Sequence, residues 1–373
     1  MPVTIEIIDS ICDISPTQWD GLADGMPLLS HAFLASLEQA NCVGKGTGWM
    51  PQPLVVRDGE QLLGAMPLYL KTHSYGEYVF DWAWADAYER SGHQYYPKLL
   101  SAIPFSPITS SRLLAKTPEI QSMLVDALEQ VMQHHQLSSA HVLFPDEASA
   151  NILQDAGWMV RHGVQFRWKN ENFTDFEHFL MTLTHDKRKK IHQERKKIQT
   201  AGVVCKRILG ADITLATLDF FYSCYANTYA EHRSSPYLTR EFFSQIVQKM
   251  PQNILLITAE LDGELIASTL SIYNQDTLYG RYWGATQFVS GLHFELCYYQ
   301  AQEFCIEAGI TYFEGGAQGE HKLARGFTPR PTCSYHKIAN SDFSVAIKDF
   351  LTRESLGIVQ YVTELEDRVP FKI

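Results

Sequence analysis

The sequence predicts an α+β protein built from two copies of one structural unit, with a boundary near residues 165–175. The chain has 373 residues, and single hydrophobic cores rarely extend beyond about 250–300 residues, so two domains are expected. Each half gives the same order of strand, helices, antiparallel meander, helix and strands. Each half also places one Asp-Gly pair between two apolar runs, at 58–59 and 262–263, which favours a tight hairpin turn. The alternative is two unrelated α/β domains.

In the first half, alternating and apolar runs predict a strand at 3–8 and a hairpin whose arms are PLVVR and QLLGAMPLYLK. Helices are expected within 20–40, 118–136 and 148–156, and strands at HVLFP and at 158–168. The stretch 72–107 is rich in aromatic residues, Gly and Pro. Its segments DWAW and FSP either line a cleft or serve as core and turn residues.

In the second half, helical periodicity covers 173–201, 215–229, 239–250 and 296–308. The runs VVCKRIL, ILLITAEL, ELIASTLSIY, TLYGRYWGA, TYFEGG and PTCSYHKI are expected strands, and 343–367 is an amphipathic helix. We therefore divide the chain into residues 1–168, residues 169–340 with the active centre, and a C-terminal helix and tail at 341–373. Each of the first two carries a mixed, mainly antiparallel sheet flanked by helices.

Composition excludes several classes of protein. Hydrophobic residues make up 45% of the chain and the formal net charge is −11, which argues against disorder and against a protein coated in nucleic acid. The N-terminus lacks the basic and apolar regions of a signal peptide, and no uncharged apolar run approaches the roughly 18 residues needed to cross a bilayer. Seven cysteines without a CxxC pair suit reduced thiols, so we expect a cytoplasmic protein without an integral membrane segment.

The densest polar cluster is EGGAQGEHKLARG at 314–326, directly after an expected strand. Its glycines allow a sharp turn and close approach to a ligand. Glu314, Glu320 and His321 are able to transfer protons, while Lys322 and Arg325 are able to hold an anion. The alternative is a Gly-rich turn bearing ordinary solvated charges.

Two further groups lie upstream of this cluster. Strand alternation would place Arg281 and Trp283 on one face and Tyr282 on the other, and an Arg beside a Trp suits a planar or anionic ligand. His293 and Glu295 follow Gly291 at the start of a helix. They either contact substrate or act only as capping and first-turn residues.

A basic run occupies 185–197, HDKRKKIHQERKK. Residues 186–197 hold seven Lys or Arg against two acidic residues, a local charge of +5 that leaves −16 on the remainder. On a helix this run has one narrow apolar stripe and otherwise basic faces. It is either a solvated surface helix or a binding site for a polyanion such as tRNA, a nucleotide or a lipid head group. The anion-binding residues would be Lys187, Arg188, Lys190 and Arg195.

Several motifs are missing from the sequence. Neither GxxxxGK[ST] nor GxSxG occurs, which argues against P-loop chemistry and an α/β-hydrolase. His293, Glu295, Glu314 and His321 are metal-ligating types, but their spacing matches no metal motif such as HExxH. We therefore expect no metal.

The segments HDKRKKIHQERKKIQTAGV, LYGRYWGA, LHFELCYYQ and FEGGAQGEHKLARGF resemble a bacterial family of FemAB-like, GNAT-type acyltransferases. The resemblance extends over nearly the whole chain and implies two tandem GNAT-like domains. GNAT folds move an acyl group from a coenzyme A thioester to an amine, whereas FemAB-like relatives move an amino acid from aminoacyl-tRNA to a peptidoglycan precursor. The acetyltransferase pyrophosphate signature [RQ]xxGx[GA] is matched only in part, by QFVSGL at 287–292.

The hypothesis is therefore an N-acyltransferase that forms an amide on a small-molecule or cell-wall-precursor amine, with acetyl-CoA, another acyl-CoA or aminoacyl-tRNA as donor. The expected catalytic residues are Glu314 or His321 as base and Lys322 as a polar donor or phosphate ligand. The competing hypothesis is a catalytically silent module that uses the GNAT scaffold to bind an acyl, nucleotide or cell-wall ligand. The expected substrate-binding residues are Arg281, Trp283, His293, Glu295, Gln318, Glu320 and Arg325.

Overall fold

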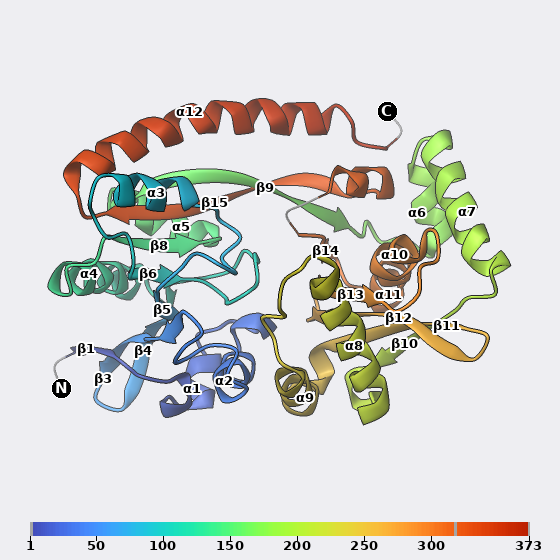
Figure 1. Ribbon diagram of the computed structural model, residues 1–373, viewed down its shortest axis with the longest axis horizontal. Helices are drawn as coiled ribbons and strands as arrows, with labels where there is room; N and C mark the ends of the chain where they lie inside the picture. Colours follow the sequence, from blue (N-terminus) through green and yellow to red (C-terminus); the bar gives the residue numbers. More distant parts are fainter. Residues whose placement is uncertain (1–2, 317–318, 372–373) are drawn as a thin grey trace. The chain divides into compact units, whose positions relative to one another are not determined.

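The computed structural model describes residues 3–316 and 319–371 and shows a mixed α+β architecture, as the sequence predicts (Figure 1). The chain divides into two compact units. Unit 1 comprises Met1–Val164 and Pro331–Tyr361, and unit 2 comprises Gln165–Arg330 and Val362–Ile373. The chain therefore crosses from one unit to the other three times, each time inside a regular element. These elements are the strands β9 (Met159–Lys169) and β15 (Thr328–Ile338) and the C-terminal helix α12 (Ser341–Glu366).

Unit 1 contains two sheets. The larger has the order β15-β8-β6-β5-β2, from β2 (Trp49–Pro51), β5 (Leu68–Lys71), β6 (Lys98–Ser101), β8 (Ser139–Leu143) and part of β15. The smaller has the order β1-β3-β4-β7, from β1 (Val3–Ile7), β3 (Leu54–Asp58), β4 (Gln61–Met66) and β7 (Leu114–Ala115). β3 and β4 form the hairpin predicted from Asp58-Gly59, with Asp58 paired to Gln61.

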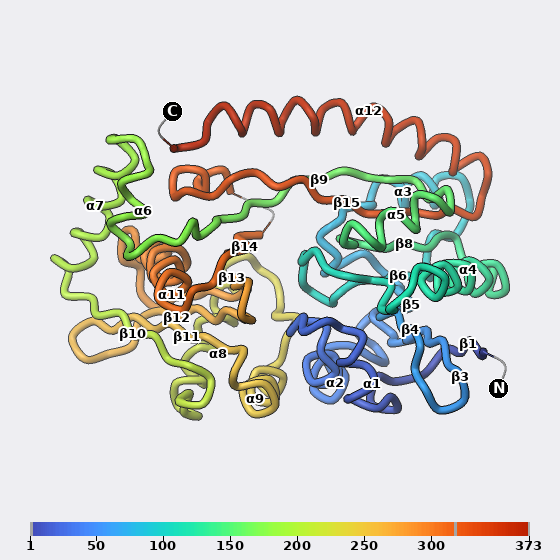
Figure 2. Tube along the Cα trace, turned by 180° about the vertical axis from the view of Figure 1, so that it is seen from behind, coloured from blue at the N-terminus to red at the C-terminus, as the bar shows by residue number. Residues whose placement is uncertain are grey.

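The helices of unit 1 pack against these sheets (Figure 2). They are α1 (Pro16–Asp20), α2 (His31–Gln39), α3 (Trp82–Arg90), α4 (Pro118–His134), α5 (Glu147–Asp155) and most of α12. Pro118 stands in the first turn of α4, where its missing N–H costs nothing. Leu124, Leu128 and Met132 recur at helical spacing and pack in one core with Val142 of β8.

The sheet of unit 2 has the order β10-β11-β12-β13-β14-β9. Its strands are β10 (Val204–Leu209), β11 (Ile254–Leu261), β12 (Glu264–Tyr273), β13 (Thr277–Ala285), β14 (Tyr312–Glu314) and the end of β9. Asp262 and Gly263, which join β11 to β12, have φ angles of 51° and 84°. Positive φ at both positions is the requirement of a type I′ hairpin turn, so the second Asp-Gly prediction is also confirmed.

Two irregularities in β13 shape the centre of unit 2. β13 pairs with β14 in parallel only from Thr277 to Tyr279, while β13 itself continues to Ala285. Along its other edge, the register with β12 shifts so that Arg281 has no direct partner. This bulge interrupts strict alternation at Arg281. The ring of Tyr282 packs against Tyr225 and Phe243, whereas the ring of Trp283 meets His293.

Helices surround this sheet in unit 2 (Figure 1). They are α6 (Phe176–Thr182), α7 (His185–Thr200), α8 (Leu215–Glu231), α9 (Arg240–Lys249), α10 (Leu292–Phe294), α11 (Gln300–Ala308), the π-helical turn η5 (Glu295–Tyr299) and the 3₁₀ turn η6 (Glu320–Arg325). α8 lies close against β13, because a Cβ on Gly284 would stand 1.9 Å from the carbonyl oxygen of Cys224. The Thr228 hydroxyl donates to the Trp283 carbonyl at 2.8 Å.

Four predicted segments differ from the structure. The expected helix at 173–201 is two helices, because Leu183 is extended between them. The helix expected at 20–40 consists of α1, which ends at Asp20, and α2. The helix expected at 296–308 begins at Leu292 and includes the π-helical turn. The aromatic stretch contains the unexpected helix α3, whose buried residues Trp84 and Tyr88 are four positions apart.

Candidate active site

A cavity of about 150 Å³ lies in unit 2 beside the part of β13 that extends past its pairing with β14. Gly280–Trp283 form one wall and Phe313 and Gly315 form another. A second cavity of about 510 Å³ shares Trp283 and His293 with the first. Where β13 and β14 stop pairing, a small polar cavity therefore lies next to a larger one. Two adjoining cavities of this kind suit a ligand whose reacting end fits the small cavity and whose longer body fits the large one.

Lys322 of η6 lines the smaller cavity and is only 6% exposed. Its Nζ donates to the Gly316 carbonyl at 3.4 Å and lies 5.6 Å from the centre of the Phe166 ring. Burial lowers the pKa of Lys322 to about 8. About one tenth of this amine is therefore neutral at pH 7 and able to accept a proton, and the neutral share rises to half near pH 8.

Two histidines lie beside Lys322. His321 Nε2 is 2.9 Å from the Tyr298 hydroxyl, and the centres of the His321 and His293 rings are 6.2 Å apart. Burial lowers the pKa of His293 to about 4, and burial together with the positive charges of Arg325 and Lys322 lowers the pKa of His321. Both rings are therefore neutral at pH 7, so each has one nitrogen that accepts and one that donates.

Arg281 and Trp283 lie where the sequence predicts a ligand site. Both line the smaller cavity, and the Trp283 ring meets the His293 ring edge-on at 5.1 Å between centres. The guanidinium of Arg281 lies 5.3 Å from the centre of the Tyr282 ring. The bulge in β13 falls at Arg281, on the wall of this cavity.

Glu314, expected as a base, is engaged in two ion pairs. Its Oε1 accepts from Arg167 Nε at 2.7 Å and from Arg330 Nη1 at 2.7 Å, and it is not among the residues lining either cavity. Burial raises the pKa of Glu314, opposed by the charge of Arg167. Its position in the structure is that of an anchor joining the end of β14 to β9 and to the start of β15.

Other predicted substrate-binding residues also have partners within the protein. Glu295 is 4% exposed and lies 3.0 Å from Arg195, and Glu320 lies 2.6 Å from Arg368. Arg325 is 2% exposed and pairs with Glu194 at 3.0 Å. These groups support the segments that carry His293, His321 and Lys322. Gln318 lies outside the described residues.

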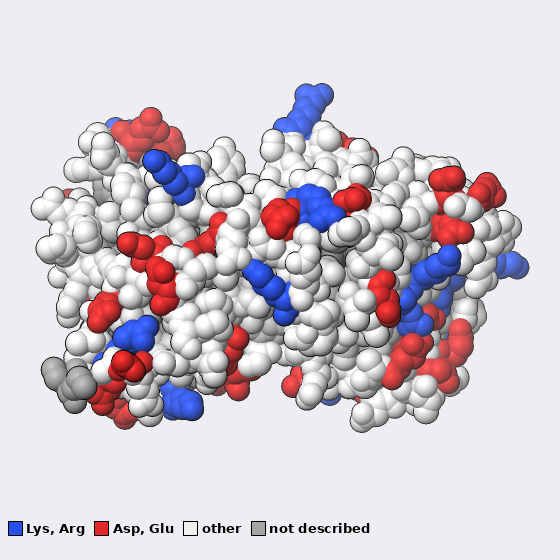
Figure 3. Space-filling model, turned by 90° about the horizontal axis from the view of Figure 1, so that it is seen from below, with Lys and Arg blue, Asp and Glu red and all other residues white. Residues whose placement is uncertain are grey.

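The basic helix α7 presents two different faces. Ile191 and Ile198 are buried, and Arg195 points toward the same side, where it pairs with Glu295 and Glu303. Arg195 is therefore placed differently from the exposed Lys190 and the half-buried Lys187 and Arg188. The opposite face is exposed and includes Lys189, Lys190, Lys196 and Lys197. On the face of the molecule in Figure 3, charges of both signs are intermixed.

Among the lining residues that were not singled out from the sequence are Cys297 and Tyr298 of η5. η5 is a π-helical turn, whose residues face differently from those of an α-helix. Burial raises the pKa of Cys297 to about 12, so this thiol is protonated. Their sequence signal was their place in LHFELCYYQ, at the start of the predicted helix 296–308.

Within residues 3–316 and 319–371, no group of three or more His, Cys, Asp or Glu side chains is arranged to hold a metal ion. The described helices include none with the length and apolar character required to span a bilayer. All seven cysteines are free thiols.

A family model described as FemAB_like, peptidoglycan biosynthesis/recognition, matches residues 10–373. The chain belongs to the FemAB-like family. The resemblance found in the sequence motifs is therefore confirmed. No curated protein sequence matches this FemAB-like chain.

Solved structures share the fold of this FemAB-like protein at low sequence identity. FemX is 12% identical with a TM-score of 0.56, covering 93% of this chain and 100% of that chain. L-PGS from Bacillus licheniformis is 9% identical with a TM-score of 0.53, covering 86% of this chain and 95% of that chain. A conserved protein of unknown function from Bacteroides thetaiotaomicron is 11% identical with a TM-score of 0.55, covering 89% and 99%. These likenesses establish a common fold.

Proposed function

We propose that this FemAB-like protein transfers an aminoacyl group from a charged tRNA to an amine of a peptidoglycan precursor, with the chemistry in the smaller cavity of unit 2. Lys322 carries the proposal, because it is a buried amine with a pKa near 8 on the wall of a polar cavity. The family description supplies the substrate class. We further propose that each unit is a GNAT-like domain and that the protein works in the cytoplasm, where charged tRNA is available.

In the proposed reaction the acceptor amine attacks the ester carbonyl of the aminoacyl donor. Neutral Lys322 takes a proton from the attacking nitrogen, and Arg281, on the same cavity, stabilises the negative oxygen of the tetrahedral intermediate. The intermediate then collapses, the amide forms, and the tRNA hydroxyl leaves with the proton held by Lys322. His321, which is hydrogen-bonded to the Tyr298 hydroxyl, supplies a second neutral group for proton transfer near the cavity.

A charged tRNA fits the structure better than coenzyme A as the donor. A pyrophosphate needs several backbone N–H groups pointing outward at a helix start. In the loop before α10, the N–H of Leu292 donates to the Val289 carbonyl at 3.1 Å and that of Phe294 to the Gly291 carbonyl at 3.0 Å. These amides are used inside the turn, while the lysines on the outer face of α7 suit the phosphates of a nucleic acid.

The experiment compares Lys322→Met with wild type in transfer of a labelled amino acid from charged tRNA to a peptidoglycan precursor. We expect turnover to fall by about 10²–10⁴-fold, the usual effect of removing a general base. The matched control is Lys169→Met, an exposed lysine of unit 2 whose side chain pairs only with Glu171 at the surface. Thermal unfolding of each variant verifies folding.

Three outcomes would contradict the proposal. Full turnover in Lys322→Met would remove Lys322 as the base. Transfer from acetyl-CoA without transfer from charged tRNA would show that the donor is wrong. Saturable binding of donor and acceptor without turnover by the wild type would favour the catalytically silent module.

A further inference from the structure

The segment from His73 to Trp82 in unit 1 reverses the usual pattern of exposure. Its polar residues Ser74, Glu77 and Asp81 are 3–4% exposed, whereas its large aromatic residues face solvent. Soluble proteins rarely bury charges while exposing several aromatic rings on one short segment. The exposed fractions are 57% for Tyr75, 41% for Tyr78, 59% for Phe80 and 39% for Trp82.

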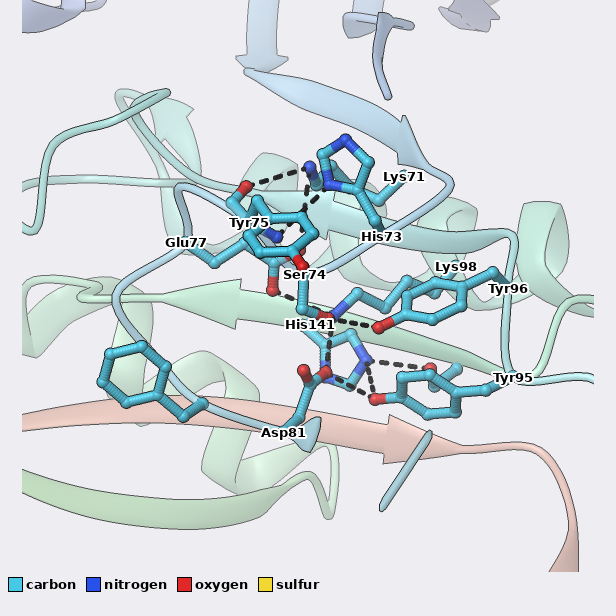
Figure 4. Close-up of polar contacts among 12 residues, drawn as sticks. Lys71, His73, Ser74, Tyr75, Glu77, Asp81, Tyr95, Tyr96, Lys98 and His141 are labelled. Atoms are coloured by element: carbon cyan, nitrogen blue, oxygen red, sulfur yellow. Dashed lines mark hydrogen bonds and ion pairs between the residues drawn. The ribbon is translucent and has the colours of Figure 1, made fainter. Parts of the chain in front are cut away.

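Two buried lysines hold this segment in place (Figure 4). Lys71 of β5 and Lys98 of β6 are register partners on adjacent strands, and neither is exposed. Lys98 Nζ donates to the Ser74 hydroxyl at 2.9 Å, to Glu77 Oε2 at 2.8 Å and to Asp81. Lys71 Nζ donates to the Tyr75 carbonyl at 3.4 Å. The sheet therefore fixes the segment at both ends and in the middle.

Further contacts extend from these anchors. The Tyr95 hydroxyl donates to Asp81 Oδ2 at 2.6 Å, and the Trp49 indole donates to the Tyr75 carbonyl at 3.1 Å. Burying a charged group costs several kcal/mol per ion. A protein with apolar residues of equal volume in place of a buried ion pair is often as stable or more stable, so stability alone does not explain this cluster. The polar arrangement instead anchors the backbone beneath the exposed rings at Ser74, Tyr75 and Asp81.

Three rings form a ladder of edge-on and tilted contacts. The centres of the His73 and Tyr75 rings are 5.2 Å apart with their planes at 66°, and those of Tyr75 and Trp82 are 4.9 Å apart with their planes at 58°. His73 is half-buried, so the exposed aromatic faces are those of Tyr75 and Trp82. Beyond Trp82, the exposed face of α3 presents Glu89 and Asp86, which pairs with Arg90 at 2.6 Å. Separate aromatic faces followed by carboxylates suit a sugar chain, since pyranose rings stack on individual aromatic faces and sugar hydroxyls donate to carboxylates.

We propose that the ladder of His73, Tyr75 and Trp82 is a saccharide-binding platform for the amino-sugar chain of peptidoglycan. The choice of this saccharide class rests on the proposed function, and the platform consists of unit 1 residues and shares none with the transfer site. An anionic membrane is a poorer occupant, because the Asp86–Arg90 pair together with Glu89 leaves a net negative charge next to the rings. The side-chain anchors of the segment lower the ordering cost of binding.

The test is a calorimetric titration of the full-length protein with the β-1,4-linked tetramer of N-acetylglucosamine. No aminoacyl donor is present. We expect saturable binding by the wild type and at least a 10-fold weaker association for Tyr75→Ala and for Trp82→Ala. Tyr75→Phe keeps the ring and should bind as the wild type does. The matched control is Phe350→Ala, since Phe350 of α12 is in the same unit and is 39% exposed, as Trp82 is.

Equal binding by wild type, Tyr75→Ala and Trp82→Ala would overturn the platform, as would absence of binding by the wild type at millimolar tetramer. Binding of the wild type, Tyr75→Phe and Phe350→Ala to phosphatidylglycerol vesicles, with loss of binding in Tyr75→Ala and Trp82→Ala, would assign the surface to a membrane instead. Because no donor is present, these results are separate from the proposed transfer reaction. Lys322→Met should bind the tetramer normally whether or not it retains turnover.

Discussion

Arg325 of η6 and Glu194 of α7 form a two-pronged ion pair, with Arg325 Nη2 at 3.1 and 3.0 Å from the two carboxylate oxygens. The same guanidinium donates to the His321 carbonyl at 2.7 Å and stacks on the Phe294 ring at 3.4 Å. One residue of the basic helix therefore holds the segment that carries Lys322. A polyanion bound on the outer face of α7 would rest on a helix that Arg325 links to the segment carrying the proposed base.

Replacing Glu194 with Gln should destabilise the protein by about 3 kcal/mol, because the side chain of Arg325 is 3% exposed and would keep a buried charge without its partner. The measurement is the free energy of unfolding in urea. The matched control is Glu171→Gln, which removes an exposed pair with Lys169 and should cost less than about 1 kcal/mol. An equal loss of unfolding free energy in the two variants would mean that the buried Glu194 pair stabilises the protein no more than an exposed pair does.

The transfer rate should rise with pH and level off above about pH 8. Lys322 must be neutral to accept a proton, and its pKa is lowered by burial to about 8, so its active form accumulates as pH increases through that value. The measurement is kcat/KM from pH 6 to 10. Residual activity in Lys322→Met should lack this inflection; an unchanged profile would assign the titration to another group.

Gly284→Ala should destabilise the protein by about 3 kcal/mol or prevent folding, because the added Cβ would lie 1.9 Å from the Cys224 carbonyl oxygen of α8. Thermal unfolding measures the effect. Gly357→Ala in α12 is the matched control, since no atom lies within 4 Å of its added Cβ. That variant should gain up to about 1 kcal/mol, because alanine favours a helix over glycine.

Mild acid should reduce stability through His336 in unit 1. Burial lowers the pKa of this 1%-exposed side chain from 6.5 to about 3. Between those values the unfolded state binds a proton that the folded state does not, so the free energy of unfolding rises with pH across this window. From pH 7 to pH 5, His336 should account for a loss of about 2 kcal/mol. Urea unfolding of His336→Gln at both pH values should show a smaller loss than the wild type; an equal loss would contradict this assignment.

Alanine at Lys189, Lys190, Lys196 and Lys197 should weaken binding of tRNA and reduce its dependence on salt. Each lost phosphate contact lowers the slope of log K against log salt by about 0.9 for a duplex, and four lost contacts lower it by about 3–4. Filter binding at several salt concentrations measures the slope. Lys45→Ala, an exposed lysine of unit 1, should leave it unchanged. An unchanged slope in the quadruple variant would make α7 an ordinary solvated helix.

The elements with local signals were predictable from sequence. Both Asp-Gly turns are hairpins, and the helix at Pro118 begins where proline permits, because these signals act within a few residues. The polar cluster around Lys322 was also recognisable from its density of glycines and charged groups beside a strand. Nothing local revealed that Glu314 is held by Arg167, which lies 147 positions earlier in the chain.

The remaining misses also come from long-range packing. The bulge at Arg281 was not foreseen, because it depends on pairing with β12 rather than on the residues of β13 alone. The anchors of the His73–Trp82 segment lie on β5 and β6, and a lysine in an apolar strand gives no sign of its partners. Helix α3 was missed because Trp82 at its start faces solvent, which obscures the apolar period set by Trp84 and Tyr88.

The π-helical turn from Glu295 to Tyr299 amounts to one residue inserted in an otherwise α-helical stretch. Deleting one residue there would restore regular winding and rotate everything before it by about 100° relative to α11. His293 would then turn away from the wall that it now shares between two cavities. A single-residue deletion at this turn would therefore change the lining of both cavities at once.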